Sequence, residues 1–279
     1  MTKPKLGLFI IADAELDNRL EAAKRLDIAT AHLLAPLSRD RQPQNRRMLM
    51  QKFNRAGVQI SAVFCQFEGE SYSSIPVVKQ TVGLVPAHLR QDRTKEAKAI
   101  SDFAAELNVG ITALHLGFIP EERETRDYQA LVETTASFCD HCAANGQSLH
   151  LETGQESAEA LLQFITDVGR KNLAINFDPA NMILYGVAQP VPALKQLGDR
   201  VKSIHCKDAV WSDKPGETFG EQVPLGEGEV NIERFVQTLK SMGYTNPYTI
   251  EREIVGEDQL RDVEQGVKLL RKLIDDIYF

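Results

Sequence analysis

Four stretches of the chain decide the fold: LHLETGQ at residues 149–155, INFDPANM at 175–182, IHCKDAV at 204–210 and TIEREI at 249–254. Each begins as an apolar run typical of a β-strand and leads to a side chain that binds metal ions or transfers protons. Those four side chains are Glu152, Asp178, His205 and Glu251. The first three follow one another at intervals of 26 and 27 residues, close to the roughly 30 residues of one strand-plus-helix unit.

Residues at the ends of successive parallel strands converge on one point when the strands close into a barrel. In a (β/α)8 barrel that point is the active site at the C-terminal face. The rest of the chain fits this fold, because apolar runs alternate with amphipathic stretches along its length. We therefore predict an α/β fold, a single-domain (β/α)8 TIM barrel over residues 1–279, with a doubly wound open sheet as the lesser alternative.

The predicted elements alternate regularly. The strands are expected at 5–11, 30–34, 59–67, 111–116, 148–152, 173–178, 201–206 and 248–251. The helices are expected at 15–27, 40–56, 92–108, 126–144, 157–169, 190–198, 231–242 and 258–277. Six glycines stand where helices should end, as is typical of the position just past a helix: Gly57, Gly110, Gly146, Gly169, Gly198 and Gly243.

One connection is too long for a simple turn between a strand and a helix. Residues 68–89 read EGESYSSIPVVKQTVGLVPAHL and follow the third predicted strand. They would therefore emerge on the catalytic face of the barrel. We predict a lid or a wall of the pocket, and a structural ornament or an interface element stays open as the alternative.

Composition excludes several classes of protein. The chain has 279 residues, of which 43% are hydrophobic and 25% charged, with a formal net charge of −7. An acidic chain has no general electrostatic reason to bind nucleic acid, and no apolar run approaches a membrane span. The apolar run at 6–12 reads as a first strand and not as a signal peptide, so the cytoplasm is the expected compartment. Cys139 and Cys142 have CxxC spacing but no second pair, which argues against a zinc site.

Two glutamates, one aspartate and one histidine form an oxygen-rich set. Such a set suits one Mn²⁺, Mg²⁺ or Co²⁺ ion better than a structural zinc, although Zn²⁺ stays open. An octahedral ion with four protein ligands has two open positions, which adjacent oxygens of an α-hydroxycarbonyl can fill. Glu152 and Glu251 could then flank the substrate as acid and base. Two carboxylates on opposite faces give epimerisation, and one carboxylate moving a proton between neighbouring carbons gives aldose–ketose isomerisation.

With these motifs the chain resembles the xylose-isomerase-like superfamily of TIM barrels, the sugar and sugar-phosphate isomerases and epimerases. The resemblance is carried by HLGF at 115–118, LETGQE at 151–156, NFDPANM at 176–182, HCKD at 205–208, PLGEGEV at 224–230 and IERE at 250–253. It implies a metal site on Glu152, Asp178, His205 and Glu251. It also implies that the two glutamates act as the acid/base groups.

The same superfamily includes the endonuclease IV DNA-repair enzymes, which need extra histidines for a trinuclear zinc cluster. Here Asn181, Gln222 and Gly220 stand at the places of those additional ligands. We therefore reject the nuclease branch and expect no nucleic-acid partner.

Four further residues are predicted to contact the substrate: His115, Asn181, Lys207 and Arg252. His115 ends the fourth predicted strand, and Lys207 and Arg252 are candidate contacts for a carboxylate or a phosphate. Without a phosphate-binding glycine motif, the sequence does not decide whether the sugar is phosphorylated.

The leading hypothesis is a divalent-metal-dependent isomerase or epimerase of carbohydrate metabolism that acts on a sugar or sugar derivative. The nearest alternative is a dehydratase of a keto-sugar or inosose at the same metal site, with His115 or Glu251 as general acid. A non-catalytic sugar-binding barrel predicts at least one missing ligand, and none of the four is missing. Formation of a homo-oligomer stays open.

Overall fold

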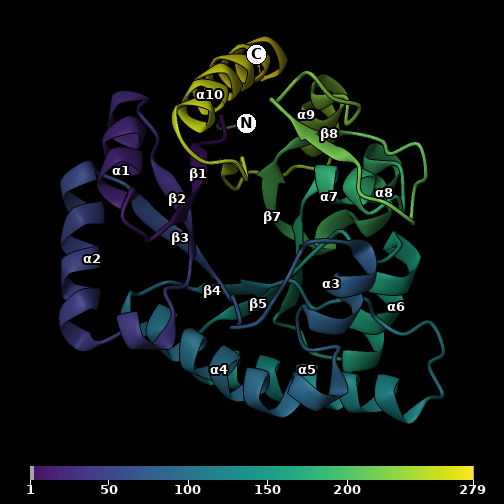
Figure 1. Ribbon diagram of the computed structural model, residues 1–279. Coiled ribbons are helices and arrows are strands. Elements are labelled where there is room, and N and C mark those ends of the chain that lie inside the picture. The colour runs from purple at the N-terminus through teal and green to yellow at the C-terminus, as the bar shows by residue number, and fades with distance from the viewer. Residues whose placement is uncertain (1–2, 279) are drawn as a thin grey trace.

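The eight predicted strands pair in parallel and close into a barrel, as the computed structural model of residues 3–278 shows (Figure 1). The strands are β1 (Leu6–Ile11), β2 (Thr30–Leu34), β3 (Gln59–Phe64), β4 (Ile111–Leu114), β5 (Ser148–Glu152), β6 (Leu173–Phe177), β7 (Val201–Cys206) and β10 (Tyr248–Ile250). They follow chain order around the barrel, and β10 closes it by pairing with both β7 and β1. The prediction of a single (β/α)8 barrel is confirmed, and the open sheet is excluded.

Each barrel strand is followed by a helix that covers the outside of the barrel. These helices are α1 (Leu16–Arg25), α2 (Pro43–Ala56), α4 (Ala87–Glu106), α5 (Arg126–Ala144), α6 (Ala158–Val168), α8 (Pro190–Leu197), α9 (Ile232–Ser241) and α10 (Glu257–Ile277). Short 3-10 turns occupy Ser38–Asp40 and Gly198–Arg200. Among residues 3–278, no helix combines the length and apolar character that crossing a membrane requires.

The structure corrects two boundaries around α4. This helix begins at Ala87, five residues before the expected start, because Pro86 has an extended conformation that ends the preceding loop. It ends at Glu106, and the left-handed residue after it is Asn108, with φ 58°, in place of the expected Gly110. Asparagine tolerates this conformation better than most residues that carry a Cβ.

Two short helices and a hairpin were not expected from the sequence. The helices are α3 (Ile75–Thr81) and α7 (Pro179–Leu184), and the hairpin joins β8 (Asp208–Val210) to β9 (Glu221–Val223) in antiparallel register. All three lie in connections that follow barrel strands, as the labels α3, α7 and β8 in Figure 1 show. Segments of three to seven residues are too short for a periodic pattern to reveal them.

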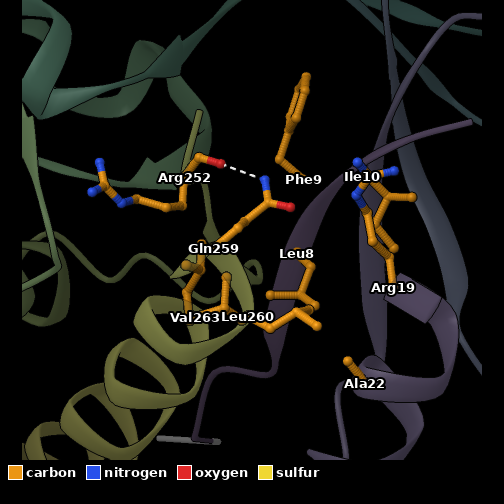
Figure 2. Close-up of a pocket in the computed structure, with 10 residues that line it drawn as sticks. Leu8, Phe9, Ile10, Arg19, Ala22, Arg252, Gln259, Leu260 and Val263 are labelled. Carbon is orange, nitrogen blue, oxygen red and sulfur yellow. Dashed lines mark hydrogen bonds between the residues drawn. The ribbon is translucent and has the colours of Figure 1, made fainter. Parts of the chain in front are cut away.

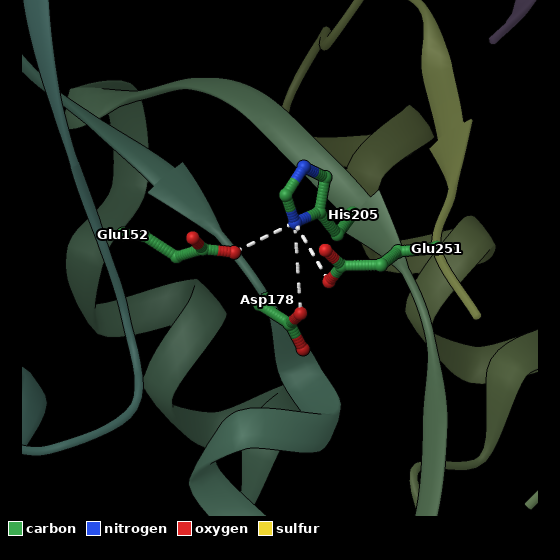
Figure 3. A group of neighbouring side chains, drawn as sticks. All are labelled: Glu152, Asp178, His205 and Glu251. Atoms are coloured by element: carbon green, nitrogen blue, oxygen red, sulfur yellow. Dashed lines mark ion pairs between the residues drawn. The ribbon is translucent and has the colours of Figure 1, made fainter. Parts of the chain in front are cut away.

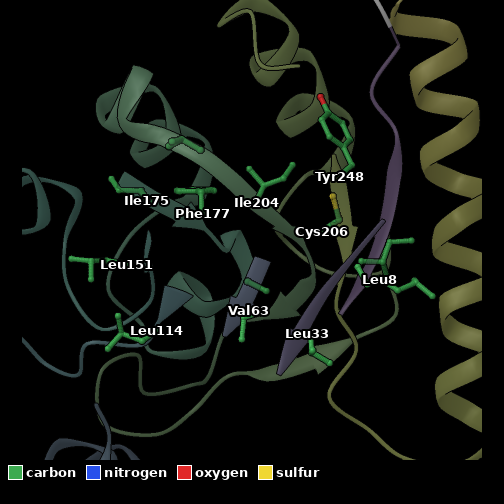
Figure 4. Packing of buried hydrophobic residues seen from close by; sticks show 14 of the residues in the cluster. Leu8, Leu33, Val63, Leu114, Leu151, Ile175, Phe177, Ile204, Cys206 and Tyr248 are labelled. Carbon is green, nitrogen blue, oxygen red and sulfur yellow. The ribbon is translucent and has the colours of Figure 1, made fainter. Parts of the chain in front are cut away.

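Side chains alternate between the barrel interior and the layer of helices. Leu8, Leu33, Leu151 and Ile204 belong to the large apolar core outside the strands, which Figure 4 shows at close range. The residues between them in sequence face the barrel interior. There Ala62, Phe64 and Ala113 form a separate apolar cluster with Phe9, Leu34 and Ile111 packed against it. This alternation decides which polar side chains reach the site.

Candidate active site

The four predicted metal ligands come together at the carboxyl ends of β5, β6, β7 and β10, which are neighbours around the barrel. Glu152, Asp178, His205 and Glu251 are all buried, and one ligand atom from each lies within 4.8 Å of the others. Nδ1 of His205 lies 2.7 Å from Glu152, 3.2 Å from Glu251 and 3.6 Å from Asp178. Figure 3 shows the three carboxylates converging on this one nitrogen.

Asp178 is held by the start of α7. Its Oδ1 accepts a hydrogen bond from the backbone N–H of Asn181 at 3.0 Å, so the carboxylate is the N-cap of this helix. Its own N–H donates to the Thr153 hydroxyl at 2.8 Å. Its other oxygen, Oδ2, is buried without a hydrogen-bond partner and lies 3.6 Å from both Nδ1 of His205 and Nζ of Lys207. A buried carboxylate oxygen without a donor is stable only if a cation satisfies it.

The charges within the cluster depend on one another. Burial raises the pKa of Glu251. Burial also opposes the ionisation of Glu152 and Asp178, but neighbouring cations lower the pKa of both. Burial lowers the pKa of His205, yet the Glu251 and Glu152 carboxylates raise it well above its ordinary value. Three carboxylates around one imidazole thus create a site that is short of positive charge, and a divalent cation would supply it.

His205 is oriented from its other side by His32, on β2. Nδ1 of His32 lies 3.0 Å from Nε2 of His205, and Nε2 of His32 lies 3.3 Å from the Thr249 hydroxyl. Burial lowers the pKa of His32 well below its usual value, so His32 is neutral and can accept the Nε2 proton of His205. The Nδ1 lone pair of His205 is then left for a metal ion. The sequence analysis missed His32, although its inward position on a strand was a usable signal.

An open cavity of about 360 Å³ adjoins the cluster. Glu152 and Glu251 both line this cavity, whereas Asp178 and His205 are fully buried beside it. Its apolar wall includes Phe9, Phe64 and Phe67. The two glutamates are therefore the cluster members that a bound molecule can reach.

The four predicted substrate contacts are placed differently from one another. His115 lines the cavity, with its Nε2 3.0 Å from Oε2 of Glu152. Lys207 is buried, and its Nζ lies 3.1 Å from the side-chain oxygen of Asn181 and 3.2 Å from Glu251. Arg252 borders the cavity, but its Nε donates to Asp262 at 2.9 Å. Of these side chains, His115 thus has the most direct access to a substrate.

The structure also brings residues to the site that the sequence analysis did not single out. Glu70 and Tyr72, from the 68–89 segment, line the cavity. Glu253 lines it as well and forms a short ion pair with Lys207. Asp208 instead binds the loop before α9, because its carboxylate accepts four backbone N–H groups, from Ala209, Gly226, Gly228 and Val230. The adjacent acidic residue of the HCKD motif is thereby explained as a structural anchor.

Comparison with known proteins identifies the family of the chain. The family model described as the xylose isomerase-like TIM barrel matches residues 20–273. The chain belongs to this family.

Several solved structures share the fold across the whole barrel. A xylose isomerase domain protein from Planctomyces limnophilus is 43% identical, with a TM-score of 0.95 and 99% of each chain covered. A D-tagatose 3-epimerase-like protein is 18% identical, with a TM-score of 0.77 and 98% of each chain covered. More distant barrels include a Mycobacterium smegmatis protein in complex with magnesium (16% identity, TM-score 0.72, 99% and 98% covered) and the probable 3-DHS dehydratase AsbF from Bacillus anthracis (15%, 0.67, 96% and 98%).

Curated relatives match over shorter stretches. The protein MJ1311 of Methanocaldococcus jannaschii is 23% identical over 184 residues, which are 62% of this chain and 59% of that protein. The L-ribulose-5-phosphate 3-epimerase UlaE of Escherichia coli is 45% identical over 51 residues, 18% of this chain and 16% of the enzyme. The matched part is thus less than two thirds of either relative's own length.

Proposed function

We propose that this protein is a divalent-metal-dependent sugar epimerase or isomerase. The proposal rests on a difference in exposure among the four residues of the cluster. All four ligand-type side chains meet, yet Glu152 and Glu251 are the pair that also lines the cavity. This is the arrangement that a reaction needs when two carboxylates hold an ion and also exchange protons with a substrate. Relatives and similar structures that bear epimerase names support the proposal.

One divalent ion fits the residues present. Glu152, Asp178, His205 and Glu251 would hold it, and the buried Oδ2 of Asp178, which accepts no hydrogen bond, is an atom that such a cation would satisfy. When bound, such an ion polarises a substrate carbonyl and makes the adjacent C–H group more acidic. Oxygen ligands with a single imidazole suit Mn²⁺, Mg²⁺ or Co²⁺, and the fold neighbour solved with magnesium is consistent with this choice.

The two glutamates then carry out the proton transfers. One takes the proton from the carbon next to the carbonyl, and the other returns a proton on the opposite face. The C–H bond electrons remain on the substrate during the transfer, so the product is the epimer and no redox partner is needed. Burial raises the pKa of Glu251, which improves it as a base or as a carrier of the proton. Phe9, Phe64 and Phe67 make one side of the cavity apolar, which disfavours water beside the reacting groups.

A dehydratase is the second candidate, and His115 is the observation that favours it. Its imidazole lines the cavity within 3.0 Å of Glu152, where it could protonate a leaving hydroxyl. The two reactions share the first proton transfer and differ only in whether water is then lost.

We also propose that residues 68–89 form a wall of the pocket. Glu70 is fixed by accepting the backbone N–H groups of Phe67 at 3.0 Å and Gly83 at 2.8 Å. Gly83 has φ 72° and lies so close to the backbone of Leu116 that a Cβ would be 2.1 Å from its carbonyl oxygen. These contacts favour a fixed wall over a mobile lid. Limited proteolysis within 68–89 that slows on substrate binding would instead indicate a lid.

The test of the proposed function is proton NMR in D₂O with a panel of ketoses and inososes. The protein is first treated with EDTA and then supplied with Mn²⁺, Co²⁺ or Mg²⁺. Metal-dependent deuterium incorporation into a sugar that loses no water supports an epimerase or isomerase. Loss of water identifies the dehydratase, and full activity of metal-free protein rules out both proposals as stated.

A further inference from the structure

The cations that border the cavity are all engaged by acidic or polar groups of the protein. Arg19 donates to both oxygens of Asp13, at 3.2 Å for Nη2–Oδ2, and to the Ile11 carbonyl at 3.1 Å. Arg252 donates to Asp262 at 2.9 Å through Nε, and its Nη1 donates to Gln222. Each guanidinium is therefore already paired with an acid of the protein, Asp13 or Asp262, which competes with an anionic group of a ligand.

Figure 2 shows both arginines beside a small second cavity of about 20 Å³ between β1, α1 and α10. The guanidinium of Arg252 extends away from the other residues that line it. The backbone carbonyl of Arg252 faces in instead and accepts a hydrogen bond from Gln259 at 2.7 Å. The Arg252 side chain thus points away from this second cavity and pairs with Asp262.

Two other cations near the site are engaged or shielded. Lys207 lies 3.2 Å from Glu251 and forms a shorter ion pair with Glu253. Arg93 is 5% exposed and is absent from the cavity lining. It lies behind the Phe67 wall of the cavity, where it packs over the Phe67 ring and donates to the Gly83 carbonyl. A ligand could reach Arg93 only by displacing that wall.

The acids of the cavity outnumber these cations. Its lining contains Asp13, Glu70, Glu152, Glu251 and Glu253. A divalent ion would not reverse this balance, because three carboxylates of the cluster already surround its position. A phosphate or carboxylate on the substrate would face like charges without a protein cation to neutralise it.

We propose that the site selects neutral, unphosphorylated sugars and rejects sugar phosphates and sugar acids. This inference rests on the proposed function and names its substrate class. Neutral hydroxyl groups can donate hydrogen bonds to the acidic lining, and the aromatic wall suits the C–H face of a sugar. The charge balance of the cavity therefore sets the specificity.

The experiment compares matched pairs: L-ribulose with L-ribulose 5-phosphate, and D-tagatose with D-tagatose 6-phosphate. The Mn²⁺-loaded protein is used for deuterium exchange in D₂O and, separately, for calorimetric binding. We expect kcat/KM and affinity to be at least about 100-fold lower for each ester than for its free sugar. An ester that is preferred, or binding of neither member of any pair, overturns the inference. Binding of the free sugars without deuterium exchange supports the inference and contradicts the proposed function.

Asp13→Asn provides the sharper test, because it removes the negative charge that pairs with Arg19 at the cavity. The asparagine oxygen can still accept the Glu15 N–H that Asp13 accepts at 2.9 Å, so the local turn is kept. We expect the ratio of kcat/KM for the free sugar to kcat/KM for its phosphate ester to fall about tenfold in this variant. Asp17→Asn is the matched control, since Asp17 pairs with Lys52 at an exposed place. An unchanged ratio in Asp13→Asn, or an equal change in the control, overturns the inference.

Discussion

Strands β1 to β4 and strands β5, β6, β7 and β10 contribute side chains of opposite character to the barrel interior. The first group provides an apolar cluster that includes Phe9, Leu34 and Phe64. The second group provides the metal-ligand cluster together with buried polar side chains such as Asn176 and Ser203. The barrel is closed, with register shifts at Ala31/His32 and Ile175/Asn176, and its two groups of strands differ in the side chains that they direct inward.

The difference shows how one barrel can hold three carboxylates in its interior. Buried charges are tolerated only when they are paired or hydrogen-bonded, and the polar half provides Lys207, His205 and backbone donors for them. The apolar half contributes no competing charge and excludes water from one side, which strengthens the electrostatic interactions. The polar half should therefore determine catalysis and the apolar half stability, and each can be tested by substitution.

The largest expected effect is on turnover. Glutamine keeps an oxygen ligand but cannot accept a proton, so Glu152→Gln and Glu251→Gln should lose about 10²–10⁴ in kcat. Both variants should still bind Mn²⁺ measurably in calorimetry, whereas His205→Ala should lose metal binding first. If the enzyme is an epimerase, each glutamine variant should impair deuterium uptake from one epimer more than from the other. Near wild-type turnover in both would falsify the two-carboxylate assignment.

The control for this pair is Glu253→Gln, which also changes an acid of the cavity lining. Glu253 lies outside the cluster, so its variant should keep turnover within about tenfold of the wild type. A loss as large as that of the cluster glutamates would mean that the polar lining as a whole, and not the pair, carries the reaction.

The second effect is on stability, and it tests the cost of charge in the polar half. Glu156 follows β5 and is 8% exposed, and burial raises its pKa from 4.5 to about 8. Between these values the folded protein keeps a proton that the unfolded chain releases. Stability should therefore fall as pH rises from about 4.5 to 8, by up to about 1.4 kcal/mol per pH unit, and then level off.

Glu156→Gln should remove most of this slope and be more stable than the wild type at pH 8, by about 4 kcal/mol. Urea unfolding at pH 5, 6.5 and 8, in EDTA so that metal binding does not contribute, measures the difference. Glu159→Gln, at an exposed position on α6, is the matched control and should follow the wild type. Parallel curves for the wild type and Glu156→Gln would show that Glu156 is solvated or paired.

Features that depend on neighbouring residues in the chain were predicted from the sequence, whereas contacts between distant residues were not. The strands at 30–34, 148–152 and 201–206 were predicted to the residue, because apolar runs bounded by polar residues define them locally. The meeting of the four ligands followed from the closure of the barrel.

Contacts between segments that are distant in the chain could not be predicted from the sequence. The engagement of Arg252 depends on Asp262 in α10 and on Gln222 in the β8–β9 hairpin, which only the folded chain brings together. The role of His32 depends on β2 lying across the barrel from β7. The inward position of His32 could be read from its strand, but local patterns contain no information on which distant side chains His32 and Arg252 contact.

The third effect is on metal affinity. It tests His32, the side chain of β2 that contacts His205 of the cluster. His32→Leu removes the acceptor for the Nε2 proton of His205, so the imidazole can take the wrong tautomer or turn. Loss of such an outer hydrogen bond typically costs about 10–100-fold in metal affinity. Calorimetry with Mn²⁺ on the metal-free protein measures this. His32→Gln keeps an acceptor and should lose less, and equal affinities in the wild type and His32→Leu would contradict the orienting role.

The smallest effect is expected from Phe64→Leu in the apolar half. The Phe64 ring meets Phe9 edge-on, with ring centroids 5.4 Å apart, and lies 5.0 Å from the His205 ring. Leucine keeps an apolar side chain but loses the aromatic contact and part of the volume, so unfolding free energy should fall by about 1–2 kcal/mol. Mn²⁺ affinity should stay within about threefold, because the ring supplies no ligand and no hydrogen bond to the cluster. Thermal unfolding and calorimetry of the same preparation separate the two quantities. A metal affinity reduced as much as in His32→Leu, at unchanged stability, would show that the apolar half positions His205 directly and that the two halves do not divide their tasks.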